Sequence, residues 1–127
     1  MIYFKPLIVV FGGNTKNNIP NNDLWIINMS QEELEWKQAT LRNSFLKPIP
    51  RLYASADICK TGRSNGMIIL YGGRDNGQNA LNDVWGLRRH RDGTWDWLKA
   101  PIKNEYTPIA RYQVVFVNIA FSLILWI

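Results

Sequence analysis

Short apolar runs separated by polar, glycine-containing turns set the pattern of this chain. Residues 7–11 form one such run and lead into Gly12-Gly13, and residues 67–71 form another and lead into Gly72-Gly73. Apolar runs of this length, bounded by turn residues, are typical of buried β-strands. The same pattern predicts further strands at 24–28, at Trp36, at 51–58, from Val84 onward and at 95–99.

The connections between these runs favour tight turns. The dipeptides Asn65-Gly66 and Asp92-Gly93 suit positions with positive φ, and we expect a two-residue hairpin at the second of them. Residues 14–22 are rich in Asn and are expected to form a loop. Only Ser30–Glu33 offers a helical alternative, because its serine and glutamate could cap a single turn.

A repeat with a fixed period underlies the pattern. Val10-Phe11-Gly12-Gly13 recurs as Leu70-Tyr71-Gly72-Gly73. In the same way, 22–25 recurs at 82–85, and the segment from Pro48 to Tyr53 recurs from Pro108. All these matches are offset by 60 residues, and Trp36 matches Trp97 at 61. A fixed period of this length indicates a repeat architecture.

Each unit of the repeat predicts four short antiparallel strands. Such a sheet cannot bury both of its faces alone, and the folds that stack small four-stranded sheets are β-propellers, which need about four to eight blades. We therefore predict an all-β fold of propeller blades in an incomplete ring of about two blades. Residues 7–40 would supply the last three strands of one blade, 51–99 a complete blade, and 111–127 the start of a truncated third.

The segment Val114–Ile127 is almost entirely apolar, with Asn118 and Ser122 as its polar residues. It is shorter than the roughly 20 residues that a membrane helix needs. Two further strands are the favoured interpretation, with a membrane-associated tail as the alternative. No membrane span is expected.

The amino-acid composition is that of a globular protein. An apolar content of 46% and a charged content of 20% are ordinary for a globular domain. The net charge of +5 does not by itself indicate a specific nucleic-acid partner. Cys59 is the single cysteine, so an internal disulfide is excluded and an intracellular protein, cytoplasmic or nuclear, is expected.

The order Phe-Gly-Gly, Asp-Leu-Trp, Trp and Pro-Arg resembles the kelch repeat of β-propellers. Segments 65–75 and 85–97 are further similar to the kelch domain of plant and apicomplexan serine/threonine protein phosphatases. After Arg111-Tyr112-Gln113 that group continues with a histidine and a small residue, whereas Val114 and Val115 follow here. The residues that carry the motif are Gly12, Gly13, Trp25, Trp36, Gly72, Gly73, Trp85 and Trp97.

The resemblance implies that any catalysis lies outside this chain. Phosphatases of this class hold two divalent metal ions in a catalytic domain, through motifs that do not occur here. His90 is the single histidine, so neither a conventional zinc site nor a catalytic residue is expected, and the chain needs no cofactor. The predicted function is a non-catalytic module that binds a protein or peptide. The alternatives are a phosphatase whose catalytic domain lies elsewhere, and a small stand-alone protein that assembles with other blades.

In kelch propellers that bind peptides, residues just after the double glycine and just after Pro-Arg line one mouth of the ring. Transferred to this sequence, these positions are Arg74, Asn76, Tyr53, Asn14, Lys16 and Gln113. Arg74 and Tyr53 are the leading candidates, because they offer a bidentate donor and an amphipathic ring. The alternative is that these positions tie blades together.

For the tryptophans, the double glycines and the basic run, a structural or solvent-exposed role is favoured over ligand binding. Trp25, Trp36, Trp85 and Trp97 are expected to pack between blades, and the double glycines to adopt positive φ. The basic run from Arg88 to Arg91 could bind phosphate or an acidic peptide, but a solvated hairpin tip is the favoured interpretation. His90 is likewise expected to be a solvated surface residue.

Overall fold

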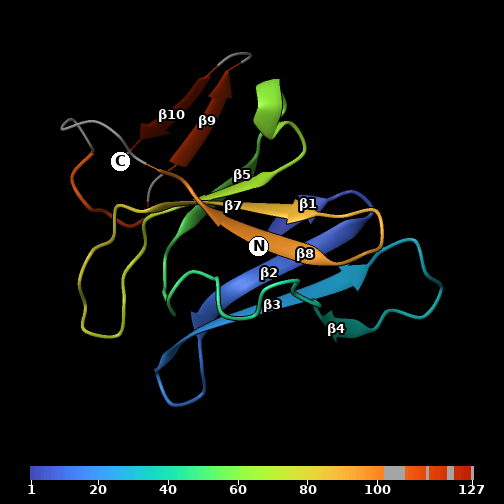
Figure 1. Cartoon of the computed structure of the whole chain (residues 1–127). Coiled ribbons are helices and arrows are strands. Elements are labelled where there is room, and N and C mark those ends of the chain that lie inside the picture. Colours follow the sequence, from blue (N-terminus) through green and yellow to red (C-terminus); the bar gives the residue numbers. More distant parts are fainter. Residues whose placement is uncertain (102–107, 114, 120–121, 127) are drawn as a thin grey trace.

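The computed structural model in Figure 1 describes residues 1–101, 108–113, 115–119 and 122–126. These residues form β-strands and one turn of 3₁₀ helix. The elements are β1 (Ile2–Phe4), β2 (Leu7–Asn14), β3 (Pro20–Asn28), β4 (Trp36–Gln38), β5 (Ser55–Ile58), η1 (Gly62–Ser64), β6 (Ile68–Tyr71), β7 (Val84–Arg89), β8 (Trp95–Lys99), β9 (Val115–Ile119) and β10 (Ser122–Trp126).

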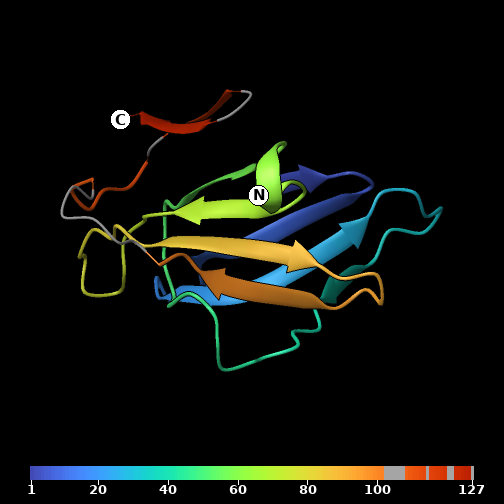
Figure 2. The same cartoon turned by 45° about the horizontal axis from the view of Figure 1, so that its top comes forward.

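The strands form two four-stranded antiparallel sheets and one hairpin. The first sheet has the order β1-β2-β3-β4, the second has the order β5-β6-β7-β8, and β9 pairs with β10. The two sheets pack against each other, and β9 lies beside β5, on the other side from the first sheet (Figures 1 and 2). The all-β prediction is confirmed, and the arrangement is that of incomplete propeller blades.

The first sheet differs from the prediction at three points. β1 was not predicted, because a three-residue strand at the N-terminus has too little pattern to stand out; it pairs with β2 from Ile2↔Val9 to Phe4↔Leu7. β2 also continues through the double glycine to Asn14, and β3 begins at Pro20. A register shift between Phe11 and Gly13 explains the continuation, since a bulge absorbs the irregularity without ending the strand.

The predicted turns form in part. The prediction of a two-residue hairpin at Asp92-Gly93 is wrong, because the His90 N–H donates to the Thr94 carbonyl at 2.8 Å and leaves three residues between them. Gly93 takes φ +85° and donates to the His90 carbonyl at 3.0 Å, which is a turn closed by a bulge. No helix forms at 30–33, where turns and bends connect β3 to β4.

Gly66 does lie at a turn, with φ +83°. The Met67 N–H donates to the Ser64 carbonyl at 2.9 Å, and Asn65 has φ −55° and ψ 128°. These angles define a type II turn, in which the third residue needs positive φ. The Asn-Gly signal therefore marks the chain reversal, in a longer connection than a two-residue hairpin.

The core lies between the facing sides of the two sheets. Leu7, Val9 and Leu24 of the first sheet are buried against apolar residues of the second. Phe4 meets Trp95 edge-on with ring centroids 5.8 Å apart, and Phe11 meets Trp97 at 4.9 Å. Each aromatic pair joins the two sheets, so this interface carries much of the apolar burial of the chain. The remaining buried members of the core are Ile68, Leu70, Trp85 and Leu87.

The four motif tryptophans have two different environments. Trp85 and Trp97 are 6% and 2% exposed, so their predicted packing between sheets is confirmed. For Trp25 and Trp36 that prediction is wrong within the described chain, since they are 38% and 49% exposed. Their side of the first sheet faces away from the second sheet, and no described element covers it.

Other sequence predictions concern backbone conformation and the C-terminal segment. Gly72 and Gly73 have φ +66° and +103°, and a Cβ on Gly73 would approach the Leu52 carbonyl to 2.8 Å, so the predicted role of glycine is confirmed there. Strands, the favoured interpretation of 114–127, are confirmed at β9 and β10. Val114, 120–121 and Ile127 lie outside the described residues.

Candidate functional site

The structure brings together three of the predicted binding positions at the end of the second sheet. Arg74 and Leu52 form an antiparallel bridge, in which each backbone N–H donates to the carbonyl of the other at 2.8 and 2.9 Å. The next residue, Tyr53, accepts a hydrogen bond from the Gln113 N–H at 3.0 Å. The segment after the double glycine therefore lies between two successive segments that follow Arg51 and Arg111.

An arginine and two tyrosines form the centre of this site, called here the Arg74 cluster (Arg74, Tyr53 and Tyr112). The guanidinium carbon of Arg74 lies 5.3 Å from the ring centre of Tyr53 and 5.8 Å from that of Tyr112. The two rings are 6.0 Å apart and inclined by 36°. Contacts of this kind between a cation and aromatic faces are attractive, so the tyrosines fix the position of the charge.

The Arg74 cluster combines exposed rings with an unsatisfied donor. Tyr53 and Tyr112 are 50% and 40% exposed. The Nε atom of Arg74 is buried and has no hydrogen-bond partner among the residues that the structure describes. A buried donor without a partner is uncommon in a folded protein, and a guanidinium can offer a carboxylate two parallel hydrogen bonds.

Tyr53 and Gln113 also share an unusual backbone conformation. Both have positive φ, 57° for Tyr53 and 56° for Gln113, although neither is a glycine. Their positions differ by one repeat of 60 residues. The left-handed conformation thus belongs to the turn after each Pro-x-x-Arg segment, where a residue other than glycine adopts it in both units.

The loop that follows Arg74 is held by a local network around Asp75. The Asn79 N–H donates to Asp75 Oδ1 at 2.9 Å, and the Asn79 side chain donates to both carboxylate oxygens at 3.2 Å. These hydrogen bonds, with the backbone N–H of Asn79 contributing most, hold the pKa of Asp75 below its usual value. Asn76 lies exposed in this loop.

The predicted positions of the first unit lie apart from the cluster. Asn14 and Lys16 are exposed, and the Asn14 side chain donates to Asn18 Oδ1 at 3.0 Å. None of the contacts described for the chain connects them to Arg74. The sequence prediction missed Tyr112; the available signal was an aromatic residue next to Arg111 in the repeated Pro-x-x-Arg segment.

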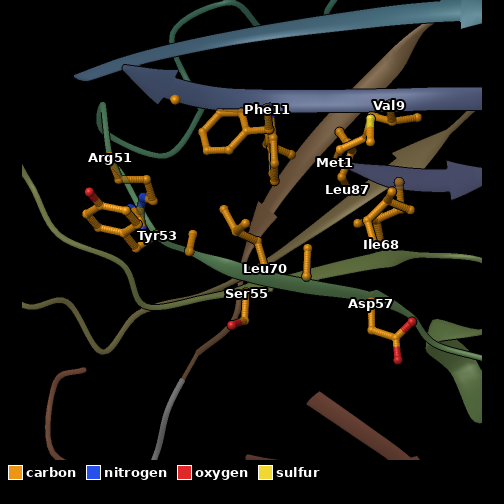
Figure 3. A pocket seen from close by; sticks show the side chains of 15 residues that line it. Met1, Val9, Phe11, Arg51, Tyr53, Ser55, Asp57, Ile68, Leu70 and Leu87 are labelled. Carbon is orange, nitrogen blue, oxygen red and sulfur yellow. The ribbon is translucent and has the colours of Figure 1, made fainter. Parts of the chain in front are cut away.

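A cavity of about 520 Å³ adjoins the cluster at Tyr53. It lies between β1 and β2 on one side and β5 on the other, with Tyr53 and Arg51 at one end and Asp57 at the other (Figure 3). Its lining is mixed: Arg51, Tyr53, Ser55 and Asp57 contribute polar groups, and core residues of both sheets contribute apolar ones. The principal apolar lining residues are Val9, Phe11, Ile68, Leu70, Leu87 and Trp97.

The basic hairpin at 88–91 has the predicted solvated arginines, since Arg88, Arg89 and Arg91 are exposed. His90 differs from its prediction: its side chain is 22% exposed, and Nε2 lies 3.7 Å from Asp96 Oδ2, because the ring folds back against the neighbouring strand. In the described parts of the chain no group of three or more His, Cys, Asp or Glu side chains could hold a metal ion. A two-metal phosphatase centre needs several histidines, so the residues present here do not fit one.

Comparison with known proteins shows what the chain is similar to. The chain is 36% identical over 113 residues to "Serine/threonine-protein phosphatase BSL2" of Arabidopsis thaliana. This match covers 87% of the chain but 10% of the relative, so the chain spans about a tenth of that protein's length. No family model matches the chain. The similarity and the paired four-stranded sheets together support a kelch-like domain.

A search of the described residues for membrane-crossing helices gave no candidate of sufficient length and hydropathy.

Proposed function

We propose that this chain is a non-catalytic module that binds a protein or peptide, and that the Arg74 cluster is its principal contact. The observation that carries the proposal is the guanidinium of Arg74, whose carbon lies 5.3 and 5.8 Å from the centres of two half-exposed tyrosine rings and which forms no ion pair with a described acidic side chain. Arginine and tyrosine are the side chains most often found at the energetic centre of protein interfaces.

The ligand chemistry that fits the cluster is a carboxylate on an exposed segment of the partner. A carboxylate would accept hydrogen bonds from the guanidinium, and such charge-assisted bonds are stronger than neutral ones. In the described chain no acidic side chain forms an ion pair with Arg74. The cluster is therefore available to a group from outside.

The adjoining cavity supplies apolar surface beside the cluster, together with the polar groups of Ser55 and Asp57. It begins at Tyr53 and continues between the sheets over Phe11 and Leu70 (Figure 3). A partner with an apolar side chain close to its carboxylate would contact both features. Asn76 and Gln113 would form the polar rim, while Asn14 and Lys16 would bind more distant parts of a large partner.

The kelch-like fold and the similarity to a phosphatase support an origin in a kelch-containing serine/threonine protein phosphatase. Under this proposal, phosphoprotein hydrolysis and its two metal ions belong to a catalytic domain outside this chain. The single His90 supports that separation. The presence of one cysteine supports an intracellular location, in the cytoplasm or the nucleus.

The test is a binding comparison between matched arginine variants. Fluorescein-labelled peptide pools, each with Asp or Glu fixed at one position and apolar residues beside it, would be titrated with the full chain and followed by anisotropy. Arg74→Lys keeps the charge but loses the planar fork, so we expect at least about a tenfold weaker binding. Arg91→Gln removes an exposed arginine of the basic hairpin and should change the affinity less than about twofold.

Two results would contradict the proposal. One is equal weakening by the Arg74 and Arg91 variants, which would indicate non-specific attraction to a basic chain. The other is an unchanged affinity when the fixed acidic residue is replaced by Asn or Gln. Tyr112→Ala provides an independent check, because it removes one ring while keeping the arginine, and we expect a loss of about threefold or more.

A further inference from the structure

One arginine joins the two sheets through both its backbone and its side chain. The Arg51 N–H donates to the Asn21 carbonyl of the first sheet at 3.3 Å. Its guanidinium reaches the second sheet, where it donates to both carboxylate oxygens of Asp83 at 2.6 and 2.8 Å and to the Gly72 carbonyl at 2.8 Å. Arg51 is 1% exposed, so this contact is a buried bridge between successive sheets.

Arg111 lies one repeat after Arg51 and is positioned in the same way. Its N–H donates to the Leu81 carbonyl at 3.0 Å, and its own carbonyl accepts the Gly73 N–H at 3.0 Å. Its Nε donates to the Ile109 carbonyl at 2.9 Å, as the Nε of Arg51 donates to Ile49 at 3.2 Å. In the described part of the chain, however, Arg111 has no carboxylate partner.

Asp23 is the complementary case. It lies one repeat before Asp83, in the same position after an asparagine and two residues before a tryptophan. Asp83 binds Arg51 and accepts a hydrogen bond from Trp85 Nε1 at 2.7 Å. Asp23 forms no ion pair with any described residue. The chain thus presents an arginine without a carboxylate at one end of the repeat and a carboxylate without an arginine at the other.

Apolar surfaces accompany these two groups. Beside Asp23, the free side of the first sheet exposes Tyr3, Trp25 and Trp36 at 58%, 38% and 49%. Their counterparts on the second sheet are covered by the first sheet. On the side of the second sheet that faces away from the first sheet, Leu98 of β8 is 44% exposed, whereas Ile69 and Tyr71 of β6 on the same side are buried. Leu98 is paired with Gly86, and its side chain points away from the side that holds Trp97.

We propose that these surfaces bind each other between two copies of the chain. Arg111 of one copy would bind Asp23 and the Gly12 carbonyl of the next, as Arg51 binds Asp83 and the Gly72 carbonyl within the chain. The exposed tryptophan side of the second copy would pack on the Leu98 side of the first. Because the two surfaces differ, the contact is head-to-tail, and each added copy leaves one surface of each kind free.

Two features of the molecule support a second copy as the occupant. The contact repeats an interface already present in the chain, between the first and the second sheet. Its charges are complementary, because among the described residues Arg111 has no carboxylate partner and Asp23 has no cationic one. β9 lies beside β5, so the incoming sheet competes with the β9–β10 hairpin for this position. The inference is independent of the ligand proposed for Arg74.

The experiment is sedimentation velocity on the full chain over a wide concentration range, combined with a charge exchange. The wild-type chain is expected to associate as its concentration rises. Asp23→Arg and Arg111→Asp should each weaken association at least about tenfold, because each places like charges opposite one another. The double variant Asp23→Arg with Arg111→Asp restores opposite charges and should recover most of the association.

Glu32→Arg is the matched control, since it makes the same change of charge at an exposed position without a described contact. The milder variants Asp23→Asn and Arg111→Gln repeat the test if a charge reversal prevents folding, and their expected loss is about threefold to tenfold. A chain that stays monomeric at all concentrations overturns the inference. So does association that the Asp23 and Arg111 variants weaken no more than Glu32→Arg, or a double variant that recovers nothing.

Discussion

The two repeats carry the same motif, yet only in the second is the side that bears the motif tryptophans covered by a neighbouring sheet. Trp85 is 6% exposed, whereas Trp25, at the equivalent position, is 38% exposed. The difference has one cause: the first sheet covers the side of the second sheet that holds Trp85, and no described element covers the corresponding side of the first. The motif therefore specifies which residues can form an interface, and a neighbouring sheet decides whether they do.

The polar parts of the repeats differ in the same way. Asp83 binds a buried arginine and the indole N–H of Trp85, while Asp23 binds neither an arginine nor a lysine in the described chain. Burial alone would raise the pKa of Asp83, but the hydrogen bonds from Arg51 and Trp85 and the charge of Arg51 lower it below its usual value. The contrast between the second repeat, where the aspartate side chain has partners, and the first, where it has none among the described residues, can be tested by substitutions at equivalent positions.

The largest expected difference is between Trp97 and Trp36. Trp97→Ala removes a ring that packs on Phe11 and Trp85 in the core, and it should lower the free energy of unfolding by about 3–5 kcal/mol. Trp36→Ala removes a half-exposed ring and should cost about 1 kcal/mol or less. Urea unfolding followed by circular dichroism measures both values. Equal losses would show that the two sheets are covered alike.

The next difference is between the two aspartates. Asp83→Asn leaves the charge of Arg51 buried without its carboxylate, and removing one partner of a buried ion pair typically costs about 3 kcal/mol or more. Asp23→Asn breaks no ion pair in the described chain and should change the free energy of unfolding by less than about 0.5 kcal/mol. The comparison fails if Asp23→Asn destabilises the chain as strongly as Asp83→Asn.

The pH dependence of stability should depend on Asp83. Its pKa is lowered in the folded chain, so its contribution is fully present above the unfolded value of about 3.9 and is lost as the pH falls through the folded value. Below about pH 4, the free energy of unfolding of the wild type should therefore fall more steeply than that of Asp83→Asn. Parallel pH profiles of the two proteins, measured by thermal unfolding, would contradict this assignment.

The smallest effect on stability is expected at Arg74. Arg74→Ala removes the contacts with Tyr53 and Tyr112, and cation–π contacts at partly exposed sites contribute about 0.5–1 kcal/mol each. The loss measured in urea should stay below about 2 kcal/mol, well under that of Trp97→Ala. A loss as large as that of Trp97→Ala would assign Arg74 to holding the sheets together, which is the alternative role of such positions.

Much of the fold could be predicted from the sequence, because the same strand and turn signals occur in both repeats. Matching Phe11-Gly12-Gly13 to Tyr71-Gly72-Gly73 located the second strand of each sheet, and the tryptophans located the third and fourth. Strand ends were harder, since a bulge after Phe11 lets β2 continue where glycines usually stop a strand. β1 could not be predicted, because its three residues pair with β2 through a turn that has no counterpart in the second unit.

Some residues of the candidate site could be predicted from the sequence and others could not. The resemblance to kelch propellers indicated Arg74, Tyr53 and Gln113, and the structure places them around one bridge between Leu52 and Arg74. Tyr112 was not predicted, since its counterpart Leu52 is not aromatic and the repeat therefore did not single out this position. The exposure of Trp25 and Trp36 could not be read from the motif either, because it depends on which surfaces have a neighbour.

The most direct test of the account measures the exposure of each tryptophan in solution. Fluorine-labelled tryptophan can be incorporated into the chain, its signals assigned by single Trp→Phe variants, and a soluble paramagnetic agent added at a protein concentration where the chain is monomeric. We predict strong broadening for Trp25 and Trp36 and little for Trp85, Trp95 and Trp97. Broadening of Trp85 and Trp97 equal to that of Trp25 and Trp36 would contradict the claim that only the second repeat has its tryptophan-bearing side covered.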